Sequence, residues 1–375
     1  MTSDAPRPSA PVRPTARVRV DHYSAVHLAA STAREVAVEC GLTGALPDRA
    51  AVLASELASN LAKHASDGTV YIQPLPLGGG VEILAVDRGP GIADLEEALR
   101  DGFTTTGTLG AGLGAVKRLA SDFTLRTRAG GTLIAARLTA PEGPVPAGQS
   151  VGGVCLPAQG EEACGDAFAV FDEPADDQDG GSRRAPDGST GPGPGASGPA
   201  ASGPVRTALV VDGLGHGSDA ADAARAAVRA FHAGPERPLP ELFAAMNRAV
   251  RRTRGAAIGV LRVRADGRGS YCATGNTRAL LLSPDGIRQR LINQPGVVGW
   301  NMPRPVVRTF TLAPGETAVL HSDGIEDRWS RDTQALSPFL LRLPPVLFAA
   351  ALAHGHGLGR DDATALALRG PENPS

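Results

Sequence analysis

The sequence has almost no net charge and few aromatic residues. Its 37 Lys and Arg residues nearly balance 39 Asp and Glu residues, and only 4% of all residues are aromatic. Without a basic surplus, the composition indicates neither nucleic acid nor an anionic membrane as a partner. No stretch reaches the roughly 18 consecutive apolar residues of a membrane-spanning helix; the most apolar one, 345–353, is too short. Residues 1–17 lack the apolar core of a signal peptide, so we expect a cytoplasmic protein.

Cysteine is scarce and widely spaced. The sequence contains no C-x-x-C pair, and its four cysteines are Cys40, Cys155, Cys164 and Cys272. This spacing favours neither a disulfide framework nor a structural zinc site. We expect buried, inert thiols in a reducing compartment.

Glycine and proline, in contrast, are abundant. The 47 Gly and 31 Pro residues make up about a fifth of the 375 residues, while 42% of the chain is hydrophobic. This composition predicts ordered domains interrupted by disordered stretches. The length predicts two or three domains at roughly 150 residues each. We expect residues 1–15 to form a disordered tail.

Residues 16–140 show the pattern of a mixed α+β domain. A strand-like alternation begins at Ala16, and Gly41 is a typical helix stop after a long helical run. The predicted helices cover 24–40, 47–64 and 113–120. The predicted strands cover 69–74, 81–87, a short run near 124, and 132–138.

A second α+β domain is predicted for residues 151–370, after a Pro- and Gly-rich linker at 141–150. Its predicted helices cover 219–231 and 239–253. Its predicted strands cover 167–171, 207–211, 256–263, 269–273, 278–282, 316–321 and 364–368. Residues 172–204 are rich in Gly, Pro and Ser and hold no bulky apolar residue, so we expect a disordered loop there.

Three motifs follow one another in the first domain. Glu56 and Asn60 are four residues apart, so a helix places them on one face. Alone, such a polar stripe is more typical of a solvated helix face. Asp87 follows an apolar strand and precedes Gly89 and Gly91, where the backbone can adopt unusual torsions. A glycine-rich run at 107–114 then enters a helix, whose N–H groups can approach a phosphate.

In this order the motifs resemble the N, G1 and G2 boxes of the GHKL (Bergerat-fold) ATPases, most closely the RsbT-like anti-sigma-factor serine kinases. The resemblance implies ATP and Mg²⁺ as cofactors, with Glu56 as general base for a serine hydroxyl and Asn60 holding Mg²⁺ on the phosphates. It places Asp87 at the adenine amino group. The other nucleotide-binding residues that it implies are Gly89, Gly91, Gly110, Gly112, Gly114 and Thr132.

Acidic residues stand at strand ends in the second domain. These positions are Asp166, Asp212, Asp323 and the pair Asp361 and Asp362. An acidic residue at a strand end is usually a turn former, but four such places make chance clustering less attractive. Oxygen ligands alone favour Mg²⁺ or Mn²⁺ over zinc.

With the motif at 212–217 (Asp-Gly-Leu-Gly-His-Gly) as its most specific part, this pattern resembles the PPM-type phosphatases of the SpoIIE and RsbX branch. The resemblance implies a β-sandwich between helices, in which two metal ions activate a water for direct attack on phosphoserine. It makes Asp212 the bridging ligand and the Gly213 carbonyl a further ligand. Asp166, Asp323 and Asp361 complete the implied metal sites.

Two departures from the pattern affect the predicted metal site. Gly165 stands where many members of the family carry an acidic residue, so the second metal is expected to bind loosely. The doublet Asp361–Asp362 leaves the last ligand open, with Asp361 favoured by its position.

Three histidines near these motifs have alternative interpretations. His216 either orders its turn, which we favour, or acts as a general acid. His354 and His356 are interpreted as polar residues of a Gly-rich loop and not as metal ligands.

The two resemblances predict an α+β fold: a Bergerat-type α/β sandwich followed by a PPM-type β-sandwich flanked by helices. They imply a partner-switching regulator of a sigma factor or stress response, with a Ser/Thr kinase half and a phosphatase half. Its implied substrates are STAS-domain anti-sigma-factor antagonist proteins, and a sigma-factor regulator is a further candidate partner. In one alternative, only the phosphatase turns over and the N-terminal domain binds a partner in a nucleotide-dependent way. In another, the phosphatase domain is a degenerate scaffold.

Overall fold

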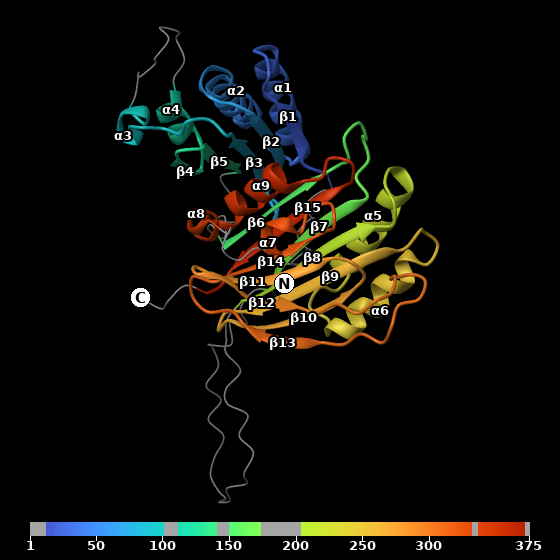
Figure 1. The fold of residues 1–375 in the computed structure, drawn as a ribbon. Helices are drawn as coiled ribbons and strands as arrows, with labels where there is room; N and C mark the ends of the chain where they lie inside the picture. Colours follow the sequence, from blue (N-terminus) through green and yellow to red (C-terminus); the bar gives the residue numbers. More distant parts are fainter. Residues whose placement is uncertain (1–12, 101–111, 141–149, 174–203, 332–336, 372–375) are drawn as a thin grey trace, which may run out of the picture.

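The computed structural model describes residues 13–100, 112–140, 150–173, 204–331 and 337–371. The predicted tail up to residue 12, Gly110, most of the predicted linker and loop residues 174–203 lie outside these ranges. Three five-stranded sheets make up the described part, one in the N-terminal domain and two in the C-terminal domain (Figure 1).

The N-terminal domain is one antiparallel sheet with helices on one face. Its strand order is β1-β2-β3-β5-β4. The strands are β1 (Ala16–Arg19), β2 (Thr69–Pro74), β3 (Gly80–Val86), β4 (Asp122–Arg128) and β5 (Gly131–Thr139). The helices are α1 (Ser24–Glu39), α2 (Leu46–His64), the short α3 (Leu95–Ala98) and α4 (Gly112–Leu119).

Helical spacing explains why these helices cover the sheet. In α1 the buried residues include Val26, Ala29, Ala33 and Val36, which lie on one stripe. Helix α2 has Pro47 in its first turn, where a missing N–H costs nothing. These apolar stripes and one face of the sheet form a continuous core.

The other face of this sheet is buried as well. Along β2, Val70 and Ile72 point to the helices, while Tyr71 belongs to a second core; in β3, Ile83 and Leu84 divide in the same way. Strand alternation therefore produces two apolar faces, and β3 is buried along its whole length because both are covered; its one charged residue, Glu82, pairs with the buried Arg137 (2.6 Å).

The C-terminal domain is a sandwich of two sheets. One has the order β13-β10-β9-β8-β7, the other β12-β11-β14-β15-β6, and their inner faces share one core. The first sheet contains β7 (Asp166–Glu173), β8 (Val205–Gly213), β9 (Ala256–Arg264), β10 (Arg268–Thr274) and β13 (Arg308–Thr311). The second contains β6 (Val151–Leu156), β11 (Arg278–Ser283), β12 (Gly286–Leu291), β14 (Thr317–His321) and β15 (Ala363–Arg369).

Helices cover the outer faces of this sandwich. Helices α5 (Ser218–His232) and α6 (Leu239–Val250) pack on the first sheet, and α9 (Pro345–His356) packs on the second. The short helices α7 (Arg328–Arg331) and α8 (Pro338–Leu341) lie near α9. The predicted fold class, two successive α+β domains with a helix-flanked sandwich at the C-terminal end, is confirmed.

Helix α9 also joins the two domains, because it lies between the second sheet of the sandwich and the face of the N-terminal sheet that α1 and α2 do not cover (Figure 1). The helix is apolar on nearly all sides, which is typical of a helix buried between layers. A polar connection runs beside it: Thr15 N–H donates to the Cys155 carbonyl (2.7 Å), and Gln73 donates to the Gly153 carbonyl (2.7 Å).

Some sequence interpretations were wrong. His354 and His356 lie in the last turn of α9 and not in a loop, because the apolar run before them continues as helix through Gly355. Strands β6, β12 and β13 were not predicted. β7 continues to Glu173, past the predicted start of the loop at 172.

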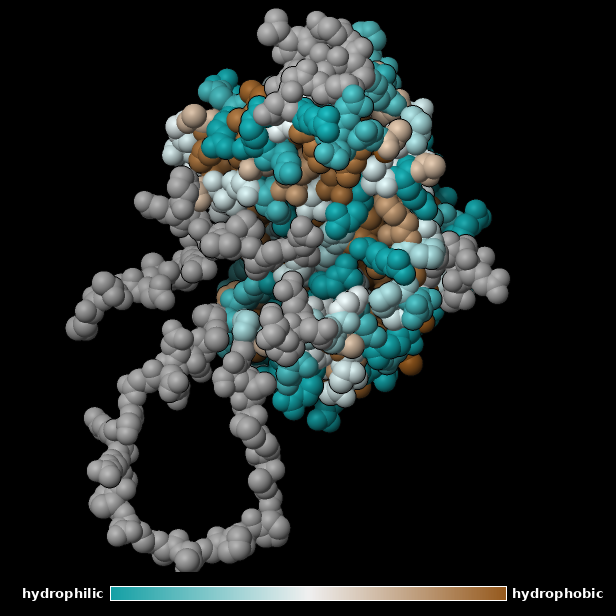
Figure 2. Space-filling view, turned by 90° about the vertical axis from the view of Figure 1, so that its left-hand side faces the viewer, coloured by the Kyte–Doolittle hydropathy of each residue, from teal (hydrophilic) through white to brown (hydrophobic). Residues whose placement is uncertain are grey.

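All four cysteines are free thiols, three of them buried. Hydrophilic and hydrophobic side chains are interspersed over the face shown in Figure 2. Within the described ranges, no helix is long and apolar enough to cross a membrane.

Candidate active sites

The first candidate site lies where α2 ends against the loop after β3. Glu56 and Asn60 are both half-buried on α2, one turn apart. The Nδ2 atom of Asn60 is buried without a hydrogen-bond partner. One turn on, the His64 carbonyl lies so close to Gly89 that a Cβ there would approach it to 3.2 Å. The helix end and the Asp87–Gly91 loop therefore form one surface.

Asp87 is fixed by backbone hydrogen bonds. Its Oδ1 accepts from the N–H groups of Gly89 (2.7 Å) and Thr132 (3.3 Å), while its own N–H donates to the Thr132 carbonyl (3.1 Å). Burial raises the pKa of the Asp87 carboxyl, and the two N–H donors act in the opposite direction. Asp87 and Thr132, 45 residues apart in the sequence, thus meet as predicted for one binding site.

Glycines stand where the backbone of this site has a positive φ or packs closely against another strand. Gly91 has φ +83°, and a Cβ there would lie 2.2 Å from the Arg128 carbonyl oxygen. Gly112, with φ 64°, begins α4, and Gly114 is buried in the same helix. Gly91 therefore lets the Asp87 loop pack against the Arg128 backbone, and Gly112 places a helix N-terminus, whose N–H groups can bind a phosphate, at the start of α4. Gly110 lies outside the described residues.

The second candidate site lies at one end of the sandwich. Asp166 begins β7 and Asp212 stands near the end of β8, and the register of this antiparallel pair places them directly opposite each other. Cross-strand partners project to the same face, so strand pairing alone brings the two carboxylates together. Asp166 is buried, and its Oδ2 accepts a hydrogen bond of 2.6 Å from the Ser322 hydroxyl.

Two further carboxylates come from the other sheet. Asp323 follows β14 and Asp361 precedes β15, and these strands are neighbours in antiparallel pairing. Asp323 accepts a hydrogen bond of 2.5 Å from the Asn276 side chain. The neighbouring Asp362 is held by the backbone instead: its two carboxylate oxygens accept hydrogen bonds from the N–H groups of Ala158 and Gly165 (2.8 and 2.7 Å).

The four carboxylates act on one another electrostatically. Burial, together with the charges of Asp166, Asp323 and Asp361, raises the pKa of Asp212 to about 9. Burial and Asp323 also raise the pKa of Asp361. The Oδ2 atom of Asp212 is buried without a hydrogen-bond partner. Such a buried acidic cluster is stabilised by a divalent cation, so the donor set fits Mg²⁺ or Mn²⁺.

The four carboxylates are nevertheless not in a coordinating arrangement. Within the described ranges, no three His, Cys, Asp or Glu side chains are already arranged to coordinate one ion. The carboxylates therefore influence one another electrostatically without forming a ready coordination shell.

Close packing explains two glycines beside the cluster. A Cβ on Gly165 would lie 2.6 Å from the Ala220 Cβ and 2.8 Å from Asp362 Oδ2. This chain therefore has no room at 165 for the acidic side chain that many members of the family carry. A Cβ on Gly213 would lie 2.4 Å from the Ala220 carbonyl oxygen, so the turn and the start of α5 are in backbone contact.

The histidine of the 212–217 motif lies at the surface. His216 Nδ1 is 3.0 Å from Glu161 Oε1, and the His216 side chain is mostly exposed. This contact holds the turn against the loop before β7, the arrangement expected of a turn-ordering residue.

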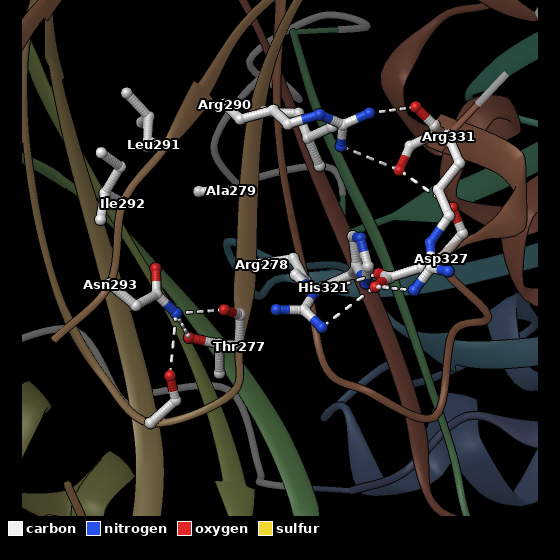
Figure 3. A pocket seen from close by; sticks show the side chains of 13 residues that line it. Thr277, Arg278, Ala279, Arg290, Leu291, Ile292, Asn293, His321, Asp327 and Arg331 are labelled. Carbon is white, nitrogen blue, oxygen red and sulfur yellow. Dashed lines mark hydrogen bonds and ion pairs between the residues drawn. The ribbon is translucent and has the colours of Figure 1, made fainter. Parts of the chain in front are cut away.

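Sequence reasoning missed Asn276 and a cavity next to it. A cavity of about 600 Å³ is lined by residues on both sides of Asn276, Gly275 and Thr277. Figure 3 shows Arg278 and Arg331 directed at Asp327 in this cavity. Asn276 carries no recognisable sequence signal, because an Asn in a strand-to-strand turn is common. The cavity lies next to the acidic cluster only through Asn276, whose side chain donates to Asp323.

Comparison with known families agrees with this two-part layout. Residues 21–138 match the histidine kinase-like ATPase domain, and residues 204–371 match the stage II sporulation protein E (SpoIIE) family. A 99-residue segment is 42% identical to the serine/threonine-protein kinase RsbT of Bacillus subtilis, covering 26% of this chain and 74% of RsbT.

A second relative matches the C-terminal part. The chain is 27% identical over 117 residues to the phosphoserine phosphatase RsbX of Bacillus subtilis, covering 31% of this chain and 59% of RsbX. The match thus spans about three fifths of RsbX. A crystal structure of RsbX in complex with magnesium is similar with a TM-score of 0.42 and 20% identity, covering 57% of this chain and 92% of that one.

Proposed function

The chain belongs to the RsbT-like branch of the histidine kinase-like ATPases through its N-terminal domain and carries a SpoIIE-type phosphatase domain behind it, and from that premise we propose a bifunctional regulator of protein phosphorylation. One half transfers phosphate from ATP to a serine or threonine, and the other half removes it. The observation that supports this best is the pairing of Asp166 directly opposite Asp212, with Asp323 and Asp361 at the ends of the neighbouring strands β14 and β15 of the other sheet.

In the phosphatase half, we assign the four aspartates to divalent cation binding, with the Gly213 carbonyl as a further ligand. When bound, the cations supply an activated water and stabilise the charge that develops on the phosphoryl group. Asp212 stands directly opposite Asp166 in the β7–β8 pair, and the charges of Asp323 and Asp361 also raise its pKa. Ser322 and Asn276 orient Asp166 and Asp323 through hydrogen bonds. Asp362, held by two backbone N–H groups, fixes the loops around the cluster.

In the kinase half, Glu56 accepts the proton of the substrate hydroxyl and Asn60 holds Mg²⁺ on the phosphates. Asp87 binds the adenine amino group, with Thr132 beside it. Phosphoryl transfer needs mainly positioning, a metal ion and a base, and this set provides the protein's share of each. Gly89, Gly91, Gly110, Gly112 and Gly114 let the backbone approach the nucleotide.

The substrates we propose are STAS-domain anti-sigma-factor antagonists of a partner-switching stress response. The choice of substrate rests on the resemblance to partner-switching regulators; the relatives, one named as a serine/threonine-protein kinase and the other as a phosphoserine phosphatase, support the pairing of the two activities. With both activities in one chain, the phosphorylation level of a substrate would follow the ratio of two rates.

To test this, the purified chain is incubated with candidate STAS-domain proteins, ATP and Mg²⁺, with and without Mn²⁺. Phosphorylation of the STAS-domain protein is followed by intact-mass spectrometry. Glu56→Ala should lose phosphate transfer while Glu35→Ala, an exposed residue on α1, keeps it. Asp212→Asn should lose dephosphorylation while Asp285→Asn, in an exposed turn, keeps it. Binding without transfer in the unaltered chain would instead support a phosphatase with a nucleotide-dependent binding domain.

A further inference from the structure

Helix α9 belongs to the cores of both domains. Its buried side chains, among them Val346 and Leu347, share one apolar cluster with Leu84 and Leu133 of the N-terminal sheet and with Ala365 of the sandwich. Packed interiors transmit displacement because they contain little free volume. Movement of one sheet against α9 must therefore be accommodated by the other.

The C-terminal end of α9 lies close to the segment after α2 and to the residue after Asp87 in the N-terminal domain. His354 Nε2 lies 3.5 Å from Asp67 Oδ2, and His354 Nδ1 lies 3.5 Å from the Tyr71 hydroxyl. Arg88 Nε lies 3.5 Å from the same Asp67 oxygen, and a Cβ on Gly355 would come within 4.0 Å of the Arg88 guanidinium. The helix end thus meets Asp67 and Arg88 together.

Asp67 and Arg88 are direct neighbours of the proposed nucleotide ligands. Arg88 follows Asp87 in the chain, and its N–H donates to the Ser66 carbonyl (2.9 Å). Ser66 and Asp67 follow α2, which carries Glu56 and Asn60. A nucleotide that orders the Asp87 loop against α2 would therefore act on the two residues that touch α9.

The same helix end is bonded to the proposed metal loops. Glu326 N–H donates to the His356 carbonyl (2.8 Å), and Leu358 N–H donates to the Gly324 carbonyl (2.9 Å). Gly357 forms a β-bridge with Ile325. The first of these partners lies three residues after Asp323, and the chain beyond Leu358 reaches Asp361 three residues later.

We propose that the adenine nucleotide held by the N-terminal domain is also an effector of the phosphatase, acting through the contact of Asp67 and Arg88 with the end of α9. The inference rests on the proposed function of both sites. Because the helix end holds the loops that carry Asp323 and Asp361, the nucleotide changes the affinity for the metal ions. By linkage, the metal ions change nucleotide affinity by the same factor.

The first experiment measures hydrolysis of a chromogenic phosphoester by the full chain across a Mn²⁺ titration, with and without a non-hydrolysable ATP analogue. The free Mn²⁺ concentration that gives half-maximal rate should shift by about fivefold or more, the lower range of known coupling between sites. A fluorescent nucleotide titrated with and without Mn²⁺ should show the reciprocal shift. Asp87→Asn, which removes the adenine contact, reports any shift that comes from Mn²⁺ chelation alone.

The second experiment removes the contact between Asp67 and the end of α9. Asp67 has φ 52°, a conformation that asparagine tolerates, so Asp67→Asn removes the charge without straining the backbone. This variant should bind nucleotide and hydrolyse the phosphoester as before but lose the nucleotide-dependent shift. His354→Gln provides a second break on the α9 side, and Asp285→Asn, in the distant turn after β11, should retain the full shift.

The outcomes separate this inference from the proposed function. If nucleotide binds and the phosphatase is active, but neither ligand changes the affinity for the other, the coupling is wrong and both activities stand. The coupling route is equally wrong if the shift survives in both Asp67→Asn and His354→Gln. If the chain binds no nucleotide or hydrolyses no phosphoester, the proposed function fails and the coupling with it.

Discussion

The shared core around α9 predicts that a truncation in the N-terminal sheet destabilises the C-terminal domain. Leu84, on β3, is fully buried and packs in the cluster that contains α9 and Trp329. Replacing a buried leucine by alanine costs about 2–5 kcal/mol, more where the surroundings cannot collapse. Since Leu84 lies between a sheet and a helix that is itself held by a second sheet, we expect about 3 kcal/mol or more for Leu84→Ala.

Urea unfolding followed by tryptophan fluorescence checks this, because both tryptophans, Trp300 and Trp329, lie in the C-terminal domain. A loss of about 3 kcal/mol with an m-value of about 3 kcal/mol per M lowers the midpoint by about 1 M. The matched control is Leu53→Ala, equally buried in α2 but in the core on the far side of the sheet. It should change the tryptophan transition less. An unchanged tryptophan midpoint in Leu84→Ala, with a separate early transition in circular dichroism, would refute a shared core.

Three further predictions concern the acidic cluster. The pKa of Asp212 is raised from 3.8 to about 9, so its neutral form is favoured in the folded metal-free protein. Its contribution to the free energy of unfolding is therefore lost as pH rises from about 4 to 9. Thermal unfolding in the presence of a chelator should show this decline, and Asp212→Asn should reduce it. Mn²⁺ or Mg²⁺ should raise the melting temperature of the wild-type chain and EDTA should reverse this, with no response in Asp212→Asn; an equal response in both would exclude Asp212 as a ligand. Gly324→Ala should destabilise by more than about 2 kcal/mol, since its Cβ would lie 1.8 Å from the Asp362 carbonyl oxygen, and calorimetry showing a wild-type melting temperature would contradict the packing described.

Much of the fold could be predicted from local pattern, whereas the shared acidic cluster was implied by the resemblance to a phosphatase family. Strand β2 was predicted with its observed bounds, 69–74, because its β-branched residues and flanking turns are explicit in the sequence. The meeting of Asp166 with Asp212 follows from pairing two strands across a long insertion. A one-residue slip would exchange the residues that face α5 and α6, such as Leu209 and Val211, with those that face the second sheet, such as Ala208 and Val210.

Other features depend on contacts that no local pattern encodes. The sequence shows that 345–353 is apolar, but not that two different sheets cover it. It contains the doublet Asp361 and Asp362, but the hydrogen bonds that hold Asp362 come from the N–H groups of Ala158 and Gly165, 204 and 197 residues away. The same holds for His354, whose partner Asp67 comes from the other domain.

The base of the β7–β8 hairpin has a practical consequence. Arg206 bonds both oxygens of Asp172 at 2.6 Å and the Ser150 hydroxyl at 2.8 Å, so the two strands are clamped where the 174–203 segment leaves them. The cost of closing a loop grows only slowly with its length. A reporter domain or affinity tag inserted between residues 174 and 203 should leave the pairing of Asp166 and Asp212 unaltered. The segment is therefore a suitable place to label the protein in living cells.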